Sequence, residues 1–233
     1  MKNCKSISIV IPVLNEVERL PLLLDYLKTD KNTVPFEIIV VDGGSTDGTL
    51  EEVENTKGVK LVISEVAGRS VQMNRGAELA SSEILYFLHA DCTPPAGFLQ
   101  LISGALSHDI DFGYFSYRFD QNKYKLQKFN ERSTRRKNIF TGGGDQSLFI
   151  HRKIFFEAGA FNEKLPIMED FDLHSRLKKR FSFRILPHDA IVSSRKYENN
   201  GYWRVQLINL AVFTGYYMGI SPNKLADFYK KNL

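Results

Sequence analysis

Cysteine is nearly absent from this chain: among its 233 residues, only Cys4 and Cys92 carry a thiol. Two cysteines cannot provide the disulfide framework on which small secreted domains depend. The sequence therefore predicts a chain that works in a reducing compartment, and we expect a cytoplasmic location.

Long apolar runs and a strong charge imbalance are also missing. The most apolar segment, residues 203–220, contains Arg204, Gln206 and Asn209 and falls short of the roughly 20 apolar residues that a spanning helix needs. It predicts a packed or membrane-surface helix instead. A net charge of +4 is too small to indicate nucleic-acid binding. The first residues include Pro12 and no small-residue cleavage site, so we expect a strand there and not a signal peptide.

The glycine-rich stretch DGGSTDGT at 42–49 lacks the residues of a phosphate-binding loop. A P-loop needs a lysine where Thr49 stands, and a dinucleotide-binding turn needs a glycine where Ser45 stands. We expect instead that the glycines let the backbone pass close to a base or a ribose. Asp42 would then accept hydrogen bonds from N–H or hydroxyl groups.

Apolar runs of strand length alternate with helix-like segments in the N-terminal half. Strands are expected at 7–14, 36–42, 59–64 and 83–91, and helices near 17–28, 47–56, 70–81 and 95–107. Continuously apolar strands, each followed by a helix, are typical of a mostly parallel sheet with helices on both faces. The sequence therefore predicts an α/β fold that is doubly wound in this half.

The pattern is less regular beyond residue 110. Strands are expected at 112–119, 146–151, 181–187 and 190–194, helices near 152–159 and 169–180, a basic helix-like stretch at 121–137, and two helices at the C-terminal end. Because no linker or repeat interrupts the chain, we expect one domain over residues 1–233.

Charged and polar residues follow the expected strands in succession, namely Glu16, Asp42, Arg69, and His89 with Asp91. In an open parallel sheet the ligand crevice lies beyond the carboxyl ends of the strands, so we expect these residues to share a site. A solvated loop residue or a helix cap is the alternative for any one of them. Asp91, followed by the rigid TPP, is a hard oxygen ligand suited to Mg²⁺ or Mn²⁺. His89 is one strand period away and is expected to point the same way.

Four motifs, SIVIPVLNE, EIIVVDGGSTDGT, HAD and MEDFDL, together resemble the family 2 glycosyltransferases of the GT-A fold over nearly the whole chain. The chain is most similar to a small bacterial subgroup with LHAD and GDQ motifs. The resemblance implies an inverting glycosyltransferase that binds a nucleotide-diphosphate sugar and Mg²⁺ or Mn²⁺, and that transfers the sugar to a hydroxyl acceptor. It also implies a nucleotide-binding half, residues 1–110, and an acceptor and catalytic-base half, residues 111–233.

The resemblance further implies roles for single residues. The nucleoside is assigned to Pro12, Glu16 and Asp42, the metal to Asp91, and the catalytic base to Asp170.

Two positions depart from the family pattern. His89 stands where the D-x-D motif has its first aspartate, which removes one negative charge from the expected metal and donor site. We still expect His89 among the residues that bind the donor. Met73 stands where the family has the arginine of its ARN motif. We expect Arg69, one helical turn earlier, to supply that positive charge to the donor.

Three further residues, Glu169, Asp145 and Arg195, complete the expected site. Glu169 and Asp170 begin the helix at 169–180, where the helix dipole favours ionised carboxylates. An inverting transfer needs such a carboxylate to take the acceptor's proton, and Glu169 is expected to orient Asp170 or the acceptor; an ordinary helix start is the alternative. Asp145, after three glycines, is expected to bind sugar hydroxyls or to cap a turn. The resemblance to the family also implies that Arg195 lies on a mobile lid, within reach of the diphosphate.

The basic stretch at 121–137 allows two interpretations, one of which involves a membrane and a lipid-linked acceptor. Seven basic residues and one acidic residue lie between 121 and 137. They form either a solvated face or a contact with anionic lipid headgroups or a lipid-phosphate acceptor, helped by the apolar C-terminal segment, as in a peripheral membrane enzyme. Two other functions stay open: a sugar-phosphate nucleotidyltransferase, whose glycine-rich loop with arginine and lysine is missing near the N-terminus, and a nucleotide-sugar-binding protein without catalysis.

Overall fold

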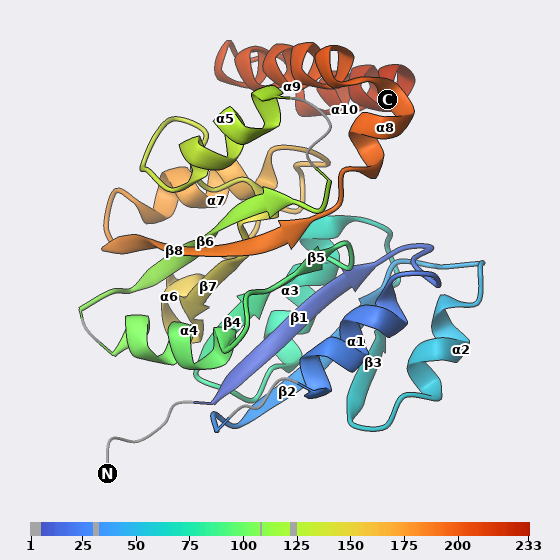
Figure 1. The fold of residues 1–233 in the computed structure, drawn as a ribbon, viewed down its shortest axis with the longest axis vertical. Helices are drawn as coiled ribbons and strands as arrows, with labels where there is room; N and C mark the ends of the chain where they lie inside the picture. The colour runs from blue at the N-terminus through green and yellow to red at the C-terminus, as the bar shows by residue number, and fades with distance from the viewer. Residues whose placement is uncertain (1–5, 30–32, 108, 122–124) are drawn as a thin grey trace.

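The computed structural model describes residues 6–29, 33–107, 109–121 and 125–233, and an eight-stranded sheet runs through them (Figure 1). The strand order is β3-β2-β1-β4-β7-β6-β8-β5. Six of these strands run in one direction: β1 (Ile7–Val13), β2 (Phe36–Asp42), β3 (Val59–Ile63), β4 (Ile84–Phe87), β6 (Phe112–Phe119) and β8 (Phe183–Val192). The other two, β5 (Cys92–Thr93) and β7 (Leu148–His151), run the opposite way. The predicted α/β class with a mostly parallel sheet is confirmed.

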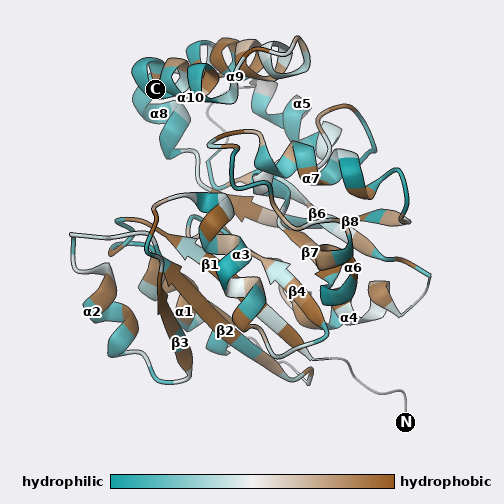
Figure 2. Cartoon of the chain, turned by 180° about the vertical axis from the view of Figure 1, so that it is seen from behind, coloured by the Kyte–Doolittle hydropathy of each residue, from teal (hydrophilic) through white to brown (hydrophobic). Residues whose placement is uncertain are grey.

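The two faces of the sheet are covered by different helices because successive strand residues point to opposite sides. On β1, Ile9 and Ile11 pack into a core with α1 (Leu20–Thr29), α2 (Thr49–Glu54) and α4 (Phe98–Leu106). Val10 points the other way, into a core with α3 (Arg69–Leu79), α6 (Arg152–Glu157) and α7 (Glu169–Leu177). Figure 2, seen from behind, shows these last three helices in front of the sheet.

The strand directions create one functional edge. The six parallel strands all end there, and β7, which runs the other way, begins there after the short 3₁₀ turn η1 (Gly144–Gln146). The segments after β4 and β8 are tied together, since the Ser193 N–H donates to the Asp91 carbonyl at 3.2 Å. Residues from both halves of the sequence therefore meet at this edge.

Helix α5 (Lys125–Thr134) and the C-terminal helices α8 (Arg195–Asn200), α9 (Tyr202–Tyr217) and α10 (Pro222–Asn232) lie beyond β6 and β8, at the top of Figure 1. Helices α9 and α10 brace the start of α7, because Met168 and Phe171 pack among Val212, Phe213 and Leu225. The position of the first residues of α7 thus depends on the C-terminal helices.

Three sequence predictions are wrong in detail. The strand expected at 83–91 ends at Phe87, and the chain then turns, with the Cys92 N–H donating to the His89 carbonyl. The strands expected at 181–187 and 190–194 are one strand, β8, in which a bulge lets Pro187 interrupt the register with β6. Three helices, not two, follow it because Gly201 separates α8 from α9.

The contact between α3 and β1 gives a test of the packing. A Cβ on Gly76 would lie 2.3 Å from Val10 Cγ1 and 3.1 Å from Val41 Cγ2. We expect Gly76→Ala to lower the free energy of unfolding by about 1–3 kcal/mol, measured by urea denaturation, because the helix must move away from the sheet. Gly104→Ala in α4 is the matched control, since a Cβ there meets no atom within 4 Å, and it should be neutral or stabilising by up to about 1 kcal/mol. Equal effects of the two substitutions would contradict this packing.

Candidate functional site

The loops that follow β1 and β2 hold each other through reciprocal hydrogen bonds. The Asn15 N–H donates to Ser45 Oγ at 2.9 Å, and the Thr46 N–H donates to Asn15 Oδ1 at 2.8 Å. Asp42, which is fully buried, accepts the N–H groups of Gly44 at 2.7 Å and Ser45 at 2.9 Å, together with the Ser45 hydroxyl. The hydrogen bonds that Asp42 accepts here therefore come from its own turn, which they hold in one conformation.

Four charged side chains gather where β1, β4 and β8 end, and we call them the carboxylate cluster: Glu16, Asp91, Asp145 and Arg195. Arg195 Nη2 lies 3.8 Å from Glu16 Oε1. Desolvation raises the pKa of Glu16, Arg195 opposes this shift, and the charge of Asp91 adds to it. Desolvation also raises the pKa of Asp145, again with a contribution from Asp91. Asp91 is thus within electrostatic reach of two other carboxylates.

A second charged group lies at the start of α7. Arg69 Nε donates to Glu169 Oε1 at 2.5 Å, and the side chain of Glu169 is only 1% exposed. The neighbouring carboxylate of Asp170 accepts the Gly144 N–H. Loss of surrounding water, and then the charge of Glu169, raise the pKa of Asp170 to about 7, although Arg69 and the bond from Gly144 act against the shift. A carboxylate with such a pKa is suited to accept a proton at neutral pH.

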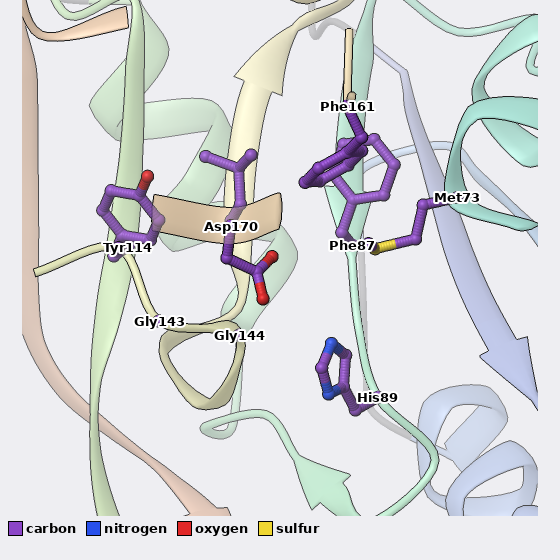
Figure 3. Close-up of a pocket in the computed structure, with 10 residues that line it drawn as sticks. Met73, Phe87, His89, Tyr114, Gly143, Gly144, Phe161 and Asp170 are labelled. Atoms are coloured by element: carbon purple, nitrogen blue, oxygen red, sulfur yellow. The ribbon is translucent and has the colours of Figure 1, made fainter. Parts of the chain in front are cut away.

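His89 faces Asp170 beside Gly144, as Figure 3 shows. A Cβ on Gly144 would lie 2.6 Å from His89 Cε1 and 2.8 Å from Asp170 Oδ2, so a glycine is required there. Burial, and then the charge of Arg69, lower the pKa of His89 to about 3, which keeps the imidazole neutral. His89 therefore lies with the charged group of α7.

Two spaces of different size border these residues. The cavity between His89 and Asp170 measures about 10 Å³, which is room for about one water molecule. A groove of about 180 Å³ lies beside the Arg69–Glu169 pair and is lined by residues 66–71 and 163–166 and by Asn223 of α10. Glu169 borders the groove and Asp170 borders the small cavity.

The structure brings most of the expected residues together in these two groups. The carboxylate cluster holds Glu16, Asp91, Asp145 and Arg195, and the group at α7 holds Arg69, His89, Glu169 and Asp170. Pro12 pairs in register with Val41 inside the sheet, and Asp42 lies in the turn described above.

Sequence reasoning missed two supporting residues. Gln72 Nε2 donates to the carbonyls of Val13 at 2.8 Å and Val41 at 2.7 Å, and it thereby clamps the ends of β1 and β2. Nothing in the sequence marks this glutamine. The run of three glycines did indicate a close approach to the backbone at Gly144. The groups that lie close to it, however, are the side chains of His89 and Asp170.

Comparison with known proteins gives consistent results. The model of the family described as "Glycosyl transferase family 2" matches residues 8–165. A PGL/p-HBAD biosynthesis glycosyltransferase of Mycobacterium tuberculosis is 30% identical over 180 residues, which cover 72% of this chain and 68% of that protein.

Solved structures share the GT-A fold. TarS 1–349 of S. aureus, in complex with UDP, superposes with a TM-score of 0.66 at 19% identity, over 88% of this chain and 66% of that one. The mannosyltransferase PcManGT of Pyrobaculum calidifontis, in complex with GDP-Man and Mn²⁺, superposes with a TM-score of 0.66 at 18% identity, over 91% of this chain and 63% of that one. The chain thus spans slightly less than two thirds of the length of these two structures.

The ion pair between the half-exposed Arg69 and the buried Glu169 gives a test of the site. Arg69→Gln leaves Glu169 buried without its charged partner, and we expect the free energy of unfolding to fall by about 1–3 kcal/mol. The double variant Arg69→Gln/Glu169→Gln should recover part of the loss. Arg75→Gln is the matched control on the same helix, because its pair with Glu78 is exposed and worth less than about 1 kcal/mol. Equal losses for Arg69 and Arg75 in urea denaturation would show that the pair does not support the site.

Proposed function

The chain belongs to glycosyl transferase family 2, and from this premise we propose that it transfers a sugar from a nucleotide-diphosphate donor to a hydroxyl acceptor, with inversion and with the help of Mg²⁺ or Mn²⁺. The observation that carries the proposal is the position of Asp170. Its half-buried carboxylate, with a pKa raised to about 7, lies at the same edge of the sheet as Asp91. A sugar transfer at that edge requires a base that takes the proton of the acceptor hydroxyl and a site that binds the leaving diphosphate.

The donor end of the proposed site is formed by the first two loops. The turn at Asp42 is rigid and carries three hydrogen bonds to its carboxylate, so a nucleoside would meet a preformed surface. Pro12 lies at the end of β1, and Glu16 has an Oε2 atom that is buried and has no hydrogen-bond partner among the described residues. A ligand hydroxyl or N–H that donates to this oxygen would satisfy it.

The metal is proposed to bind at Asp91. Within the described residues, no group of three or more histidine, cysteine, aspartate or glutamate side chains is arranged to hold a metal ion. The Asp91 carboxylate nevertheless fits Mg²⁺ or Mn²⁺, since Mg²⁺ is commonly bound by one or two carboxylates together with the phosphates of the substrate. Asp91 lies near Asp145 and Glu16, so a cation would also relieve the repulsion in the carboxylate cluster. When bound, the ion would neutralise the charge that develops on the leaving diphosphate.

Asp170 is proposed to take the proton of the acceptor hydroxyl. The Gly144 N–H fixes its carboxylate, and the neutral imidazole of His89 adds no charge that would lower its basicity. Glu169 holds Arg69 in place and borders the 180 Å³ groove, which we assign to the acceptor. Arg195, near Glu16, would contact the diphosphate, and Asp145 would contact the sugar hydroxyls.

Substitution of Asp170 tests its proposed role as the general base. We expect Asp170→Asn to lower the rate of sugar transfer, or of donor hydrolysis, by about 10²–10⁴-fold, because general base catalysis is lost. In the wild type the base must be deprotonated, so kcat/KM should fall as the pH drops through about 7, and not through the ordinary range near 4. Release of the nucleoside diphosphate, measured against pH, reports both effects.

Asp172→Asn is the control for this experiment. Asp172 lies in the same helix turn, but it pairs with Arg176 at 2.8 Å and belongs to neither charged group. Its removal should leave kcat and the acidic limb unchanged. A wild-type rate in Asp170→Asn would remove Asp170 as the base. No release of nucleoside diphosphate by the wild type above the rate without protein would instead favour a nucleotide-sugar-binding protein without catalysis.

A second prediction concerns the metal. A screen of UDP-, GDP- and dTDP-sugars should identify a ligand whose effect on Tm grows when Mn²⁺ is added, by about 5–10 °C at about 100 times its Kd. Asp91→Asn should lose the increment that depends on Mn²⁺. Asp25→Asn, on the exposed surface of α1, should keep it. An unchanged increment in Asp91→Asn would remove Asp91 from the metal site.

A further inference from the structure

The outer face of α9 is apolar although no part of the described chain covers it. Trp203, Leu207, Leu210, Tyr217 and Met218 follow one another along this face and the end of the helix, and each is between 52% and 76% exposed. We call these five residues the α9 face. Figure 2 shows the hydrophobic colouring along α9 at the top of the molecule.

The opposite face of the same helix is also apolar. Tyr202, Val205, Ile208 and Val212 are buried against the rest of the protein. A helix that is apolar on both sides is stable only when both sides are covered, and α9 contains no acidic residue. Single exposed apolar residues need no explanation, but an ordered row along four turns indicates a partner.

The α9 face continues into its neighbours. The Phe140 ring lies 4.9 Å from the ring of Phe213, which in turn lies 4.9 Å from Tyr217. Phe140 and the preceding Ile139 are themselves 50% and 68% exposed. The apolar surface therefore reaches the loop that directly follows the basic helix α5. Helix α5 itself lies next to α9 in both views (Figures 1 and 2).

Positive charge surrounds this surface. Residues 125–140 and 202–232 together contain ten basic and two acidic residues, a net charge of +8. Because the whole chain carries only +4, the remaining residues are net negative. Lys128, Arg132 and Arg136 near α5, Arg204 in α9 and Lys230 in α10 are exposed. Lys123, which belongs to the same basic stretch, lies outside the described residues.

We propose that the α9 face docks on the surface of a membrane that contains anionic lipids. No helix in the described part of the chain is long and apolar enough to cross a bilayer, so α9 would lie in the plane of the interface. An apolar face with aromatic residues at both ends, Trp203 and Tyr217, and basic residues beside it is the pattern of such interfacial helices. A second copy of the chain would bring the positive charges of both copies together, whereas anionic headgroups neutralise them.

The docking surface is connected to the candidate active site. The Phe171 ring lies 5.3 Å from the ring of Phe213, and Phe171 directly follows Asp170 in α7. Asn223 of α10 lines the groove that we assigned to the acceptor. If the proposed function holds, the membrane would therefore lie beside the acceptor groove, and a lipid-phosphate acceptor would reach it without leaving the bilayer.

Vesicle flotation tests the docking without any enzyme assay, so its failure is distinct from a failure of the proposed reaction. The full chain is mixed with vesicles of phosphatidylcholine containing 30% phosphatidylglycerol, or of phosphatidylcholine alone. We expect binding to the anionic vesicles, weakened by high salt and much weaker on neutral ones. Leu207→Gln/Leu210→Gln should lower the partition coefficient at least about tenfold, since two apolar side chains no longer enter the interface.

The matched control is Leu22→Gln/Ile63→Gln, which changes two equally exposed apolar residues on α1 and β3, far from α9 in Figure 1. It should leave flotation unchanged. Arg132→Gln/Arg136→Gln should reduce binding to the anionic vesicles only. Thermal melts verify that each variant is folded. Equal binding to neutral and anionic vesicles would overturn the proposal. It would also be overturned if the wild type does not float with vesicles and forms, in light scattering, a dimer that Leu207→Gln/Leu210→Gln dissociates.

Discussion

The narrow gap at Gly144 is the constraint on which the candidate site depends. The backbone there separates His89 from Asp170 by so little that a single methyl group would collide with both. Only an antiparallel strand inserted into the parallel sheet brings this backbone to the right edge, because β7 begins where its neighbours end. The glycine thereby joins the segment after β4, from the first half of the chain, to the start of α7, from the second half.

Charge is distributed around this gap in two groups with different properties. Beside α7, Arg69 compensates Glu169, while burial keeps His89 neutral and raises the pKa of Asp170. In the carboxylate cluster, Asp91 acts on Glu16 and Asp145, with Arg195 near Glu16. The first group suits the acceptance of a proton and the second suits a cation with a diphosphate. Such a division is what an inverting transfer between two substrates requires.

The sequence was informative where local pattern determines structure. Apolar runs located β1, β2, β3 and β6, and the polar residues that follow the parallel strands lie at one edge of the sheet. It failed where long-range contacts decide. Period-two reasoning was applied to His89 although β4 ends at Phe87 and the chain turns after it. Pro187 suggested a break between two strands because the bulge that accommodates it depends on the register with β6. The clamp at Gln72 joins strand ends that are remote in sequence, and no local pattern indicates such contacts.

A crystal structure of the protein with its nucleoside diphosphate and Mn²⁺ tests the central claim most directly, because anomalous scattering locates the ion without ambiguity. The account predicts a manganese peak at the Asp91 carboxylate, bridged to the diphosphate, with the nucleoside against the turn at Asp42 and the Asp170 carboxylate facing the sugar side of the diphosphate. A peak away from Asp91, or a nucleotide bound elsewhere than the edge where β1, β2 and β4 end, would contradict it.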